Sequence, residues 1–372
     1  MTVCRRARRW STVLLPAVAL VASCSADPEA ARLASRPPVV EQTSSTAVPT
    51  TAAPTTTLAP TTTAAPTTTL APTTTVPPTI MQLTGLPASD PLHVLRRALV
   101  VKIDNHPEAR PQFGLNAADI VFEENVEGLT RFAAVFHSTD ADQVGPIRSG
   151  RTQDVDLLGG LNRPLFAWSG GNEGTKAALR ASDLIDVGPY AVEGSVYFRD
   201  RRGNESLEHT LYSSTTRLWS QAPEGFSPPP AQFEYRGAAE RALGEPSTGL
   251  DVAMDGVDVR WLWDDTSRLY LRFQGGREHF DALLGQLSAA NVVVLEVRYQ
   301  PSPADEKSPE AQTVGSGAAW VVSDGTLRRG SWERADRRSP FTLIDSEGRT
   351  IRLTPGRTWV ELARVGRVAP LV

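Results

Sequence analysis

The residues best suited to bind a ligand or take part in a reaction lie in one short run, residues 145–151. Within it Arg148 and Arg151 stand three residues apart, directly before a predicted helix. Two guanidinium forks beside helix-terminal amides suit a carboxylate, a phosphate or a sugar acid. The same arginines could instead pair with nearby acidic residues in a network that fixes the fold and binds nothing. Such partners are Glu123, Glu124 and Asp154. The spacing leaves both interpretations open.

More polar residues stand at or just beyond the ends of predicted strands. Ligands of open α/β sheets bind in the crevice outside the carboxyl ends of the strands. We therefore expect these side chains to gather at one edge of the sheet, where an anionic cell-wall fragment or an envelope protein would bind. The candidate ligand-binding residues are Asp104, Asn105, Glu124, Glu127, Arg131, Arg148, Ser149 and Arg151.

Acidic residues of the same region could also carry out acid–base hydrolysis of a glycan. Neighbouring residues on a strand point to opposite faces, so at most one of Glu123 and Glu124 faces a given cleft. Glu124 with Asp104 is the pair that remains. The chain has no Gly-x-Ser-x-Gly, Ser-x-x-Lys or His-Glu-x-x-His motif, and its histidines are isolated in the sequence. We favour a non-catalytic binding module, keep a glycan hydrolase as the alternative, and expect no cofactor and no metal.

The elements that must position these residues are predicted to form an α/β layered domain over residues 81–230. Apolar runs indicate strands, and runs between them have the length and composition of helices. The expected strands are 98–103, 119–123, 131–137 and 164–168. The expected helices are 151–158, 175–182 and 210–221.

The second half, residues 231–372, is predicted to be mainly antiparallel β, so the fold class is α+β. Alternating apolar residues over 257–263 and 269–273 indicate a hairpin with one apolar face, made up of Val257, Val259, Trp261 and Trp263 on one strand and Leu269, Leu271 and Phe273 on the other. A short helix is expected at 279–287 and a mobile loop at 301–313. Trp320, Trp332 and Trp359 could form a glycan-stacking surface, but their place in strands favours core packing. The remaining expected strands are 291–299, 318–322, 327–333, 341–344, 350–353 and 358–362.

The first 23 residues have the features of a secretory signal, with four arginines followed by a short apolar run. The signal ends in Val-Ala-Ser before Cys24, which resembles the lipobox of bacterial lipoproteins. In such proteins the cysteine is acylated, for instance with palmitate. We therefore expect Cys24 to hold the protein in membrane lipid on the extracytoplasmic face, since two or more acyl chains give lasting anchorage. An ordinary cleaved signal with an incidental cysteine is the alternative.

Residues 24–80 are predicted to be a disordered, low-complexity stalk. The unit Ala-Pro-Thr-Thr-Thr-x occurs four times, and residues 42–89 carry no charge. Such a segment cannot bury a core. It could be O-glycosylated or be an unmodified linker.

Charge and cysteine content exclude further classes. The signal contains four arginines and no acid, so the net charge of −4 becomes −8 in the mature chain. Such a protein lacks the basic surface of a nucleic-acid binder. Cys4 leaves with the signal and Cys24 carries lipid, so the folded part has no disulfide and no cysteine nucleophile.

Two stretches of the first half closely resemble the DUF3048 family of YerB-like bacterial lipoproteins. They are Val-Lys-Ile-Asp-Asn-His-Pro-Glu-Ala-Arg-Pro-Gln at 101–112 and Val-Gly-Pro-Ile-Arg-Ser-Gly-Arg at 144–151. The resemblance continues to Pro-Gly-Arg-Thr-Trp at 355–359 and covers nearly everything after the stalk. It implies two domains, an envelope compartment and lipid anchorage, and no particular reaction. The family usually carries Pro-His-Asn before Leu-Tyr, whereas this chain has Glu208-His209-Thr210. Only the positions of His209 and of the Leu-Tyr pair match the family, so His209 is the residue of this loop that is included among the candidate ligand-binding residues.

Overall fold

The structure, a computed structural model, describes residues 79–237 and 239–371. The signal, Cys24 and the stalk up to residue 78 lie outside the described residues. Within them the chain is rich in strands and poor in helices. The three α-helices are short, so the layered α/β arrangement expected for the first half is not confirmed. They are α1 (Gln153–Leu158), α2 (Glu173–Arg180) and α3 (Thr215–Trp219).

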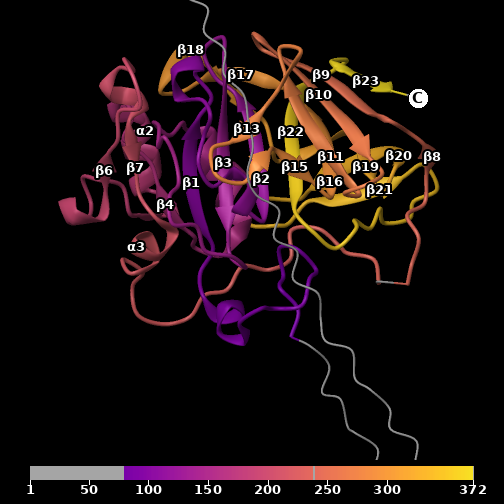
Figure 1. The fold of residues 1–372 in the computed structure, drawn as a ribbon, viewed down its shortest axis with the longest axis horizontal. Coiled ribbons are helices and arrows are strands. Elements are labelled where there is room, and N and C mark those ends of the chain that lie inside the picture. Colours follow the sequence, from indigo (N-terminus) through magenta and orange to yellow (C-terminus); the bar gives the residue numbers. More distant parts are fainter. Residues whose placement is uncertain (1–78, 238, 372) are drawn as a thin grey trace, which may run out of the picture. The chain divides into compact units, whose positions relative to one another are not determined.

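One large mixed sheet takes strands from both halves of the chain (Figure 1). Its centre is β22, which is parallel to β16 on one side and to β2 on the other. A strand from the end of the chain thus lies beside strands from its beginning. In sheet order the strands are β21 (Thr342–Asp345), β20 (Thr326–Arg334), β19 (Gly315–Ser323), β16 (Asn291–Val297), β22 (Thr358–Arg364), β2 (Ile120–Asn125), β3 (Thr130–Phe136), β1 (Leu99–Asp104), β4 (Leu165–Ala167) and β5 (Ile185–Asp186), with β8 (Glu245–Pro246) paired to β20.

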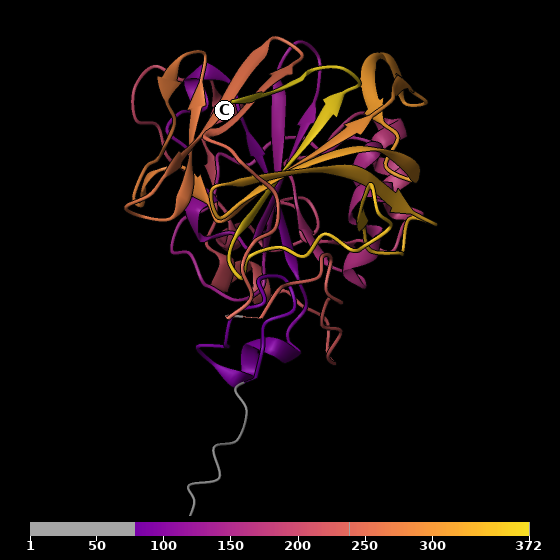
Figure 2. The ribbon, with the colours of Figure 1, turned by 90° about the vertical axis from the view of Figure 1, so that its right-hand side faces the viewer.

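A second, antiparallel sheet is built from the second half alone, and Figure 2 shows its orange strands from the side. Its strands are β12 (Arg277–Glu278), β11 (Leu269–Gln274), β10 (Val257–Asp264), β9 (Gly249–Met254) and β23 (Val368–Leu371), with β15 (Ser288–Ala289) paired to β11. Three two-stranded ribbons complete the strands: β6 (Phe198–Arg199) with β7 (Leu211–Tyr212), β13 (Phe280–Asp281) with β14 (Gly285–Gln286), and β17 (Tyr299–Ser302) with β18 (Asp305–Ala311).

The two faces of the large sheet are covered differently. Strand residues alternate between faces, so Val101 and Phe132 pack with the second sheet, whereas Val100 and Phe122 pack with Leu157 and its neighbours around α1. Trp332 and Trp359 are buried, as expected for core residues, and Trp320 is half-buried.

Four local predictions of secondary structure were wrong. The expected strand at 350–353 is not a strand, and only its two end residues, Thr350 and Leu353, form isolated bridges. The expected helix at 279–287 is the β13–β14 ribbon, because the Asp281 carboxylate accepts the amides of Leu283 and Leu284 and closes a turn. The expected loop at 301–313 is largely the β17–β18 ribbon. The expected helix at 210–221 begins only at Thr215, because the residues before it form β7. In each case tertiary pairing outweighed the local pattern.

Candidate functional site

The segment with the two arginines is fixed at the carboxyl end of β1. The amide of Asp104 donates to the Pro146 carbonyl at 3.0 Å, and the amide of Arg148 donates to the Lys102 carbonyl at 2.8 Å. On its other side the Arg148 carbonyl accepts from Ser169, which follows β4. The segment therefore lies between the ends of two parallel strands.

Strand register brings three of the predicted residues into a row. Arg131 is paired with Asp104 on β1 and with Glu124 on β2. Directly paired residues share a face of the sheet. The side chains of Asp104, Arg131 and Glu124 therefore belong to the face that carries α1.

Arg148 and Arg151 are both engaged by carboxylates. Nη2 of Arg148 lies 2.6 Å from Oε2 of Glu208, and its Nε lies 3.2 Å from Oδ2 of Asp104. Arg151 donates from Nε and Nη2 to the two oxygens of Glu127, at 3.1 and 2.6 Å. These contacts favour the internal network for both arginines, although the partners are not those expected from the sequence. Glu127 and Glu208 are partly exposed, so both pairs border solvent.

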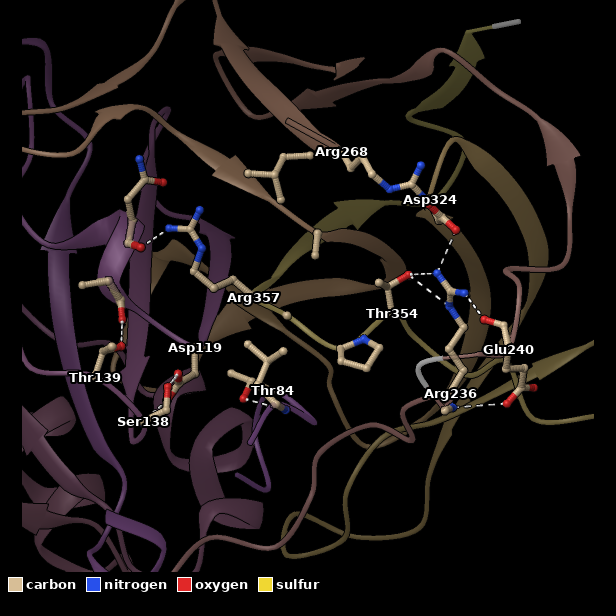
Figure 3. Close-up of a pocket in the computed structure, with 18 of the residues that line it drawn as sticks. Thr84, Asp119, Ser138, Thr139, Arg236, Glu240, Arg268, Asp324, Thr354 and Arg357 are labelled. Carbon is tan, nitrogen blue, oxygen red and sulfur yellow. Dashed lines mark hydrogen bonds and ion pairs between the residues drawn. The ribbon is translucent and has the colours of Figure 1, made fainter. Parts of the chain in front are cut away.

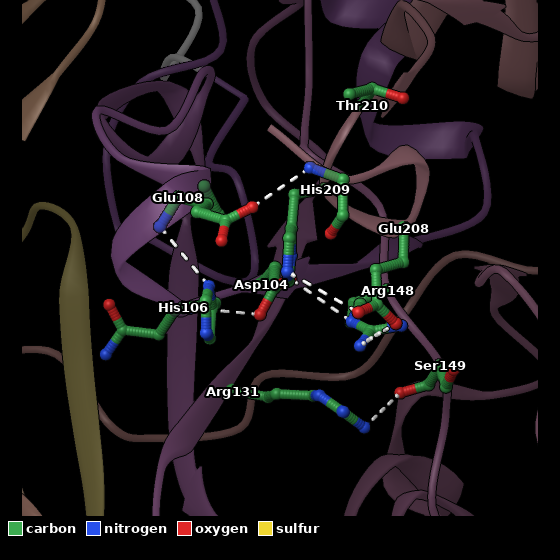
Figure 4. Close-up of polar contacts among 12 residues, drawn as sticks. Asp104, His106, Glu108, Arg131, Arg148, Ser149, Glu208, His209 and Thr210 are labelled. Atoms are coloured by element: carbon green, nitrogen blue, oxygen red, sulfur yellow. Dashed lines mark hydrogen bonds and ion pairs between the residues drawn. The ribbon is translucent and has the colours of Figure 1, made fainter. Parts of the chain in front are cut away.

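Arg131 differs from these two arginines. Its side chain donates to the Ser149 carbonyl at 3.0 Å, and no carboxylate of the described residues lies within salt-bridge distance of it. Arg131 is only 8% exposed. Burial and the nearby charge of Arg151 lower its pKa to about 10, so it remains protonated at neutral pH. Figure 4 shows its guanidinium reaching toward Ser149, below Asp104 and Arg148.

Asp104 and His209 form the buried centre of the same cluster (Figure 4). Nδ1 of His209 lies 2.6 Å from Oδ2 of Asp104, and the His106 ring stacks on the His209 ring with centroids 4.3 Å apart. The other oxygen of Asp104 accepts the His106 amide at 3.0 Å. Both histidines are isolated in sequence, so only the fold joins them.

Two predicted residues do not belong to the cluster around Asp104 and His209. Glu124 is fully buried, pairs with Lys102 and adjoins Asp154, and burial together with the Asp154 charge raises its pKa. Asn105 is also buried and donates to Thr130 and Gln274 toward the second sheet. The structure thus groups Asp104, Arg131, Arg148, Ser149 and His209, with Glu127 and Arg151 at the rim. Since Glu124 is closed to solvent, the Glu124–Asp104 pair gains no support as a hydrolytic pair.

A second polar cluster lies on the opposite face and was missed by sequence reasoning. The buried carboxylate of Glu123 accepts from Arg272 at 2.7 and 2.9 Å and from Trp359 at 3.2 Å. Glu361, next to Glu123 on the parallel strand, accepts from Trp261 at 2.9 Å. Burial first and the Glu123 charge second raise the pKa of Glu361 well above its usual value. This cluster ties β2 to the second sheet and has no access to solvent.

Arg272 also corrects the predicted hairpin. Leu269, Leu271 and Phe273 were expected to be the inner face of β11, but they are only half-buried. The fully buried side consists of Tyr270, Arg272 and Gln274. An arginine can occupy this face because Glu123 on the opposing sheet neutralises it.

A cavity of about 990 Å³ lies at the other end of the large sheet (Figure 3). Asp119, just before β2, is buried there, and its carboxylate accepts the Ser138 amide at 2.7 Å. Burial raises the pKa of Asp119 to about 6. The cavity's Arg236 is engaged by Asp324 and Thr354, at 2.9 and 2.7 Å. No sequence signal marked this cavity, because its lining comes from distant segments.

The family whose description reads "Protein of unknown function (DUF3048) N-terminal domain" matches residues 83–227, and the corresponding C-terminal domain matches residues 250–360. "Putative lipoprotein YerB" of Bacillus subtilis (strain 168) is 26% identical over 286 residues, which are 75% of this chain and 85% of that protein. The crystal structure of YerB from Bacillus subtilis superposes with a TM-score of 0.69 at 22% identity, covering 79% of this chain and all of that one. Among the described residues, no helix combines the length and apolarity needed to cross a membrane.

Proposed function

The chain belongs to the DUF3048 family, and from this premise we propose that it is a lipid-anchored lipoprotein of the extracytoplasmic face. Cys24 carries the acyl chains, and the folded part binds an anionic group of a cell-wall component. The lipobox at Cys24 supports the anchor, as does the name of the Bacillus subtilis relative. The cluster of three arginines at the carboxyl end of β1 supports the binding role.

Arg131 is the observation that carries the proposal. A buried guanidinium normally has a carboxylate partner, because removing the charge from water costs free energy that only pairing offsets. Arg131 uses a backbone carbonyl instead and lies beside two further arginines. A carboxylate or phosphate that binds beside Arg131 would supply the missing counter-charge. Glu127 and Glu208, which are partly exposed, could then yield their arginines to the same anion.

The test compares Arg131→Met with the wild-type chain. Methionine keeps most of the apolar stem and removes the charge. The ligands are muropeptides, which carry carboxylates, and poly(glycerol phosphate), which carries phosphates. Binding is measured by isothermal titration calorimetry. We expect one of the two to bind wild type, and Arg131→Met to bind it about 10- to 100-fold more weakly, as loss of a charged hydrogen bond of about 1.5–3 kcal/mol implies.

Arg97→Met is the matched control. Arg97 is also 8% exposed and also donates to a backbone carbonyl, that of Arg163, but it precedes β1 and so lies at the opposite end of the strand. Its replacement should leave binding unchanged. Equal binding by Arg131→Met and wild type would refute the site. Failure of both ligands to bind wild type would refute the wall-component proposal and leave an envelope protein as the partner to test.

A further inference from the structure

A second group of potential ligand atoms lies beside Asp104 and is formed by His106, Glu108 and His209. One ligand atom from each residue lies within 4.8 Å of the other two. His106 and Glu108 come from the turn after β1, and His209 ends the turn of residues Leu207–His209 before β7. We propose that these three residues bind a divalent transition-metal ion of the zinc class.

Asp104 prepares His209 for this role. Its carboxylate can only accept a hydrogen bond, so Nδ1 of His209, at 2.6 Å, carries the proton. Nε2 is then the ring atom left to face a metal, and Oε1 of Glu208 lies 3.7 Å from it. A carboxylate behind a histidine in this way is the usual outer shell of a metal-bound imidazole, where it fixes the tautomer and the ring orientation. Both side chains are nearly fully buried, so the orientation is rigid.

His106 and Glu108 provide the adjustable part of the site. His106 is half-buried, and its ring lies parallel to that of His209, at an interplanar angle of 5°. Zinc at about 2.0–2.1 Å from each nitrogen requires the ligand atoms to approach one another and the His106 ring to tilt out of the stack. Its Nδ1 accepts only a long bond of 3.3 Å from the Glu108 amide, so little opposes that tilt.

Glu108 brings the negative charge. The Ser206 amide donates to its carboxylate at 2.9 Å, which holds the side chain beside the two histidines. Its side chain is exposed, so the open side of the site faces solvent. Two imidazoles and one carboxylate with an open position form a ligand set that suits zinc and related ions rather than calcium or magnesium. Arg131, which carries the anion proposal, is not one of the three ligands, although Asp104 contacts both His209 and Arg148.

The experiment titrates the full-length chain, without a histidine tag and after treatment with a chelator, with Zn²⁺ in a calorimeter. Co²⁺ absorption in the visible range then reports the ligand geometry. We expect the wild-type chain to bind one equivalent of Zn²⁺. His106→Gln and Glu108→Gln should each lose more affinity than the about 10- to 100-fold that loss of an outer-shell partner costs.

Asp104→Asn tests the positioning residue. It should weaken Zn²⁺ binding about 10- to 100-fold and alter the Co²⁺ spectrum while one equivalent still binds. His93→Gln is the matched control, because His93 is partly exposed and lies 3.7 Å from Asp90 but belongs to no group of three potential metal ligands among the described residues. Its binding should equal that of wild type. Absence of Zn²⁺ binding by wild type, or equal affinity in wild type and His106→Gln, would overturn the site.

Discussion

Replacing Arg272 by methionine should destabilise the protein strongly. Arg272 and Glu123 are both fully buried, and one guanidinium nitrogen contacts both carboxylate oxygens. Methionine fills much of the same volume, so the main loss is electrostatic. Breaking a buried pair by removing one partner costs about 3–5 kcal/mol, because the remaining charge is left uncompensated.

The neighbours of Glu123 place the expected cost in the upper part of that range. After the substitution Glu123 keeps only the hydrogen bonds from Thr130 and Trp359, at 2.7 and 3.2 Å. Glu361 beside it is a further buried carboxyl. A domain is typically stable by about 5–15 kcal/mol, so the variant would lie close to the limit of folding.

Urea denaturation followed by tryptophan fluorescence measures the effect. The control is Arg260→Met on β10, whose pair with Asp251 is largely exposed and should contribute less than about 1 kcal/mol. The double variant Glu123→Gln with Arg272→Met removes the uncompensated charge and should recover much of the stability. A loss below about 1 kcal/mol in Arg272→Met, or strictly additive losses in the double variant, would refute the reasoning.

Two further predictions concern other parts of the chain. Burial raises the pKa of Asp119 to about 6, so its contribution to folding is complete below pH 4 and declines as pH rises to about 6. The free energy of unfolding of wild type, relative to that of Asp119→Asn, should therefore fall by up to about 3 kcal/mol over this pH range. Urea titrations at each pH measure this difference. A pH-independent difference would contradict this account. Cys24→Ala should move the protein from the membrane to the soluble fraction, because the acyl chains are its proposed anchor; membrane fractionation decides, and full retention of the variant would be incompatible with lipidation.

The strands that position Asp104 and Arg131 were predictable because the apolar pattern that indicates them is local in the sequence. Runs such as residues 98–103 and 131–137 are mostly apolar, as is typical of a strand that is buried on both faces. The positions of the polar residues after these strands were predictable as the points where the apolar runs end, but their burial was not: Asp104 and Asn105 are both buried.

The partners of those residues were not predictable. Arg148 and Arg151 pair with Glu208 and Glu127, although Glu123 and Glu124 were equally plausible from the sequence. A salt bridge depends on distances in space, and strand register determines these distances. The same limit applies to His106 and His209, which are far apart in the chain but stacked in the fold.

The sequence alone determined the features that depend on composition and period, namely the apolar strands of the first half and the membership in a family, and it predicts a signal cleaved before Cys24 and a threonine- and proline-rich stalk. Only the tertiary structure decided that β22 joins the two halves in one sheet and that the polar side of β11 faces inward. The physical reason is that both features depend on contacts between distant segments: the inward side of β11 carries Arg272, whose charge a buried carboxylate of the opposing sheet neutralises. Glu123, which meets Arg272, stands 149 residues away in the chain.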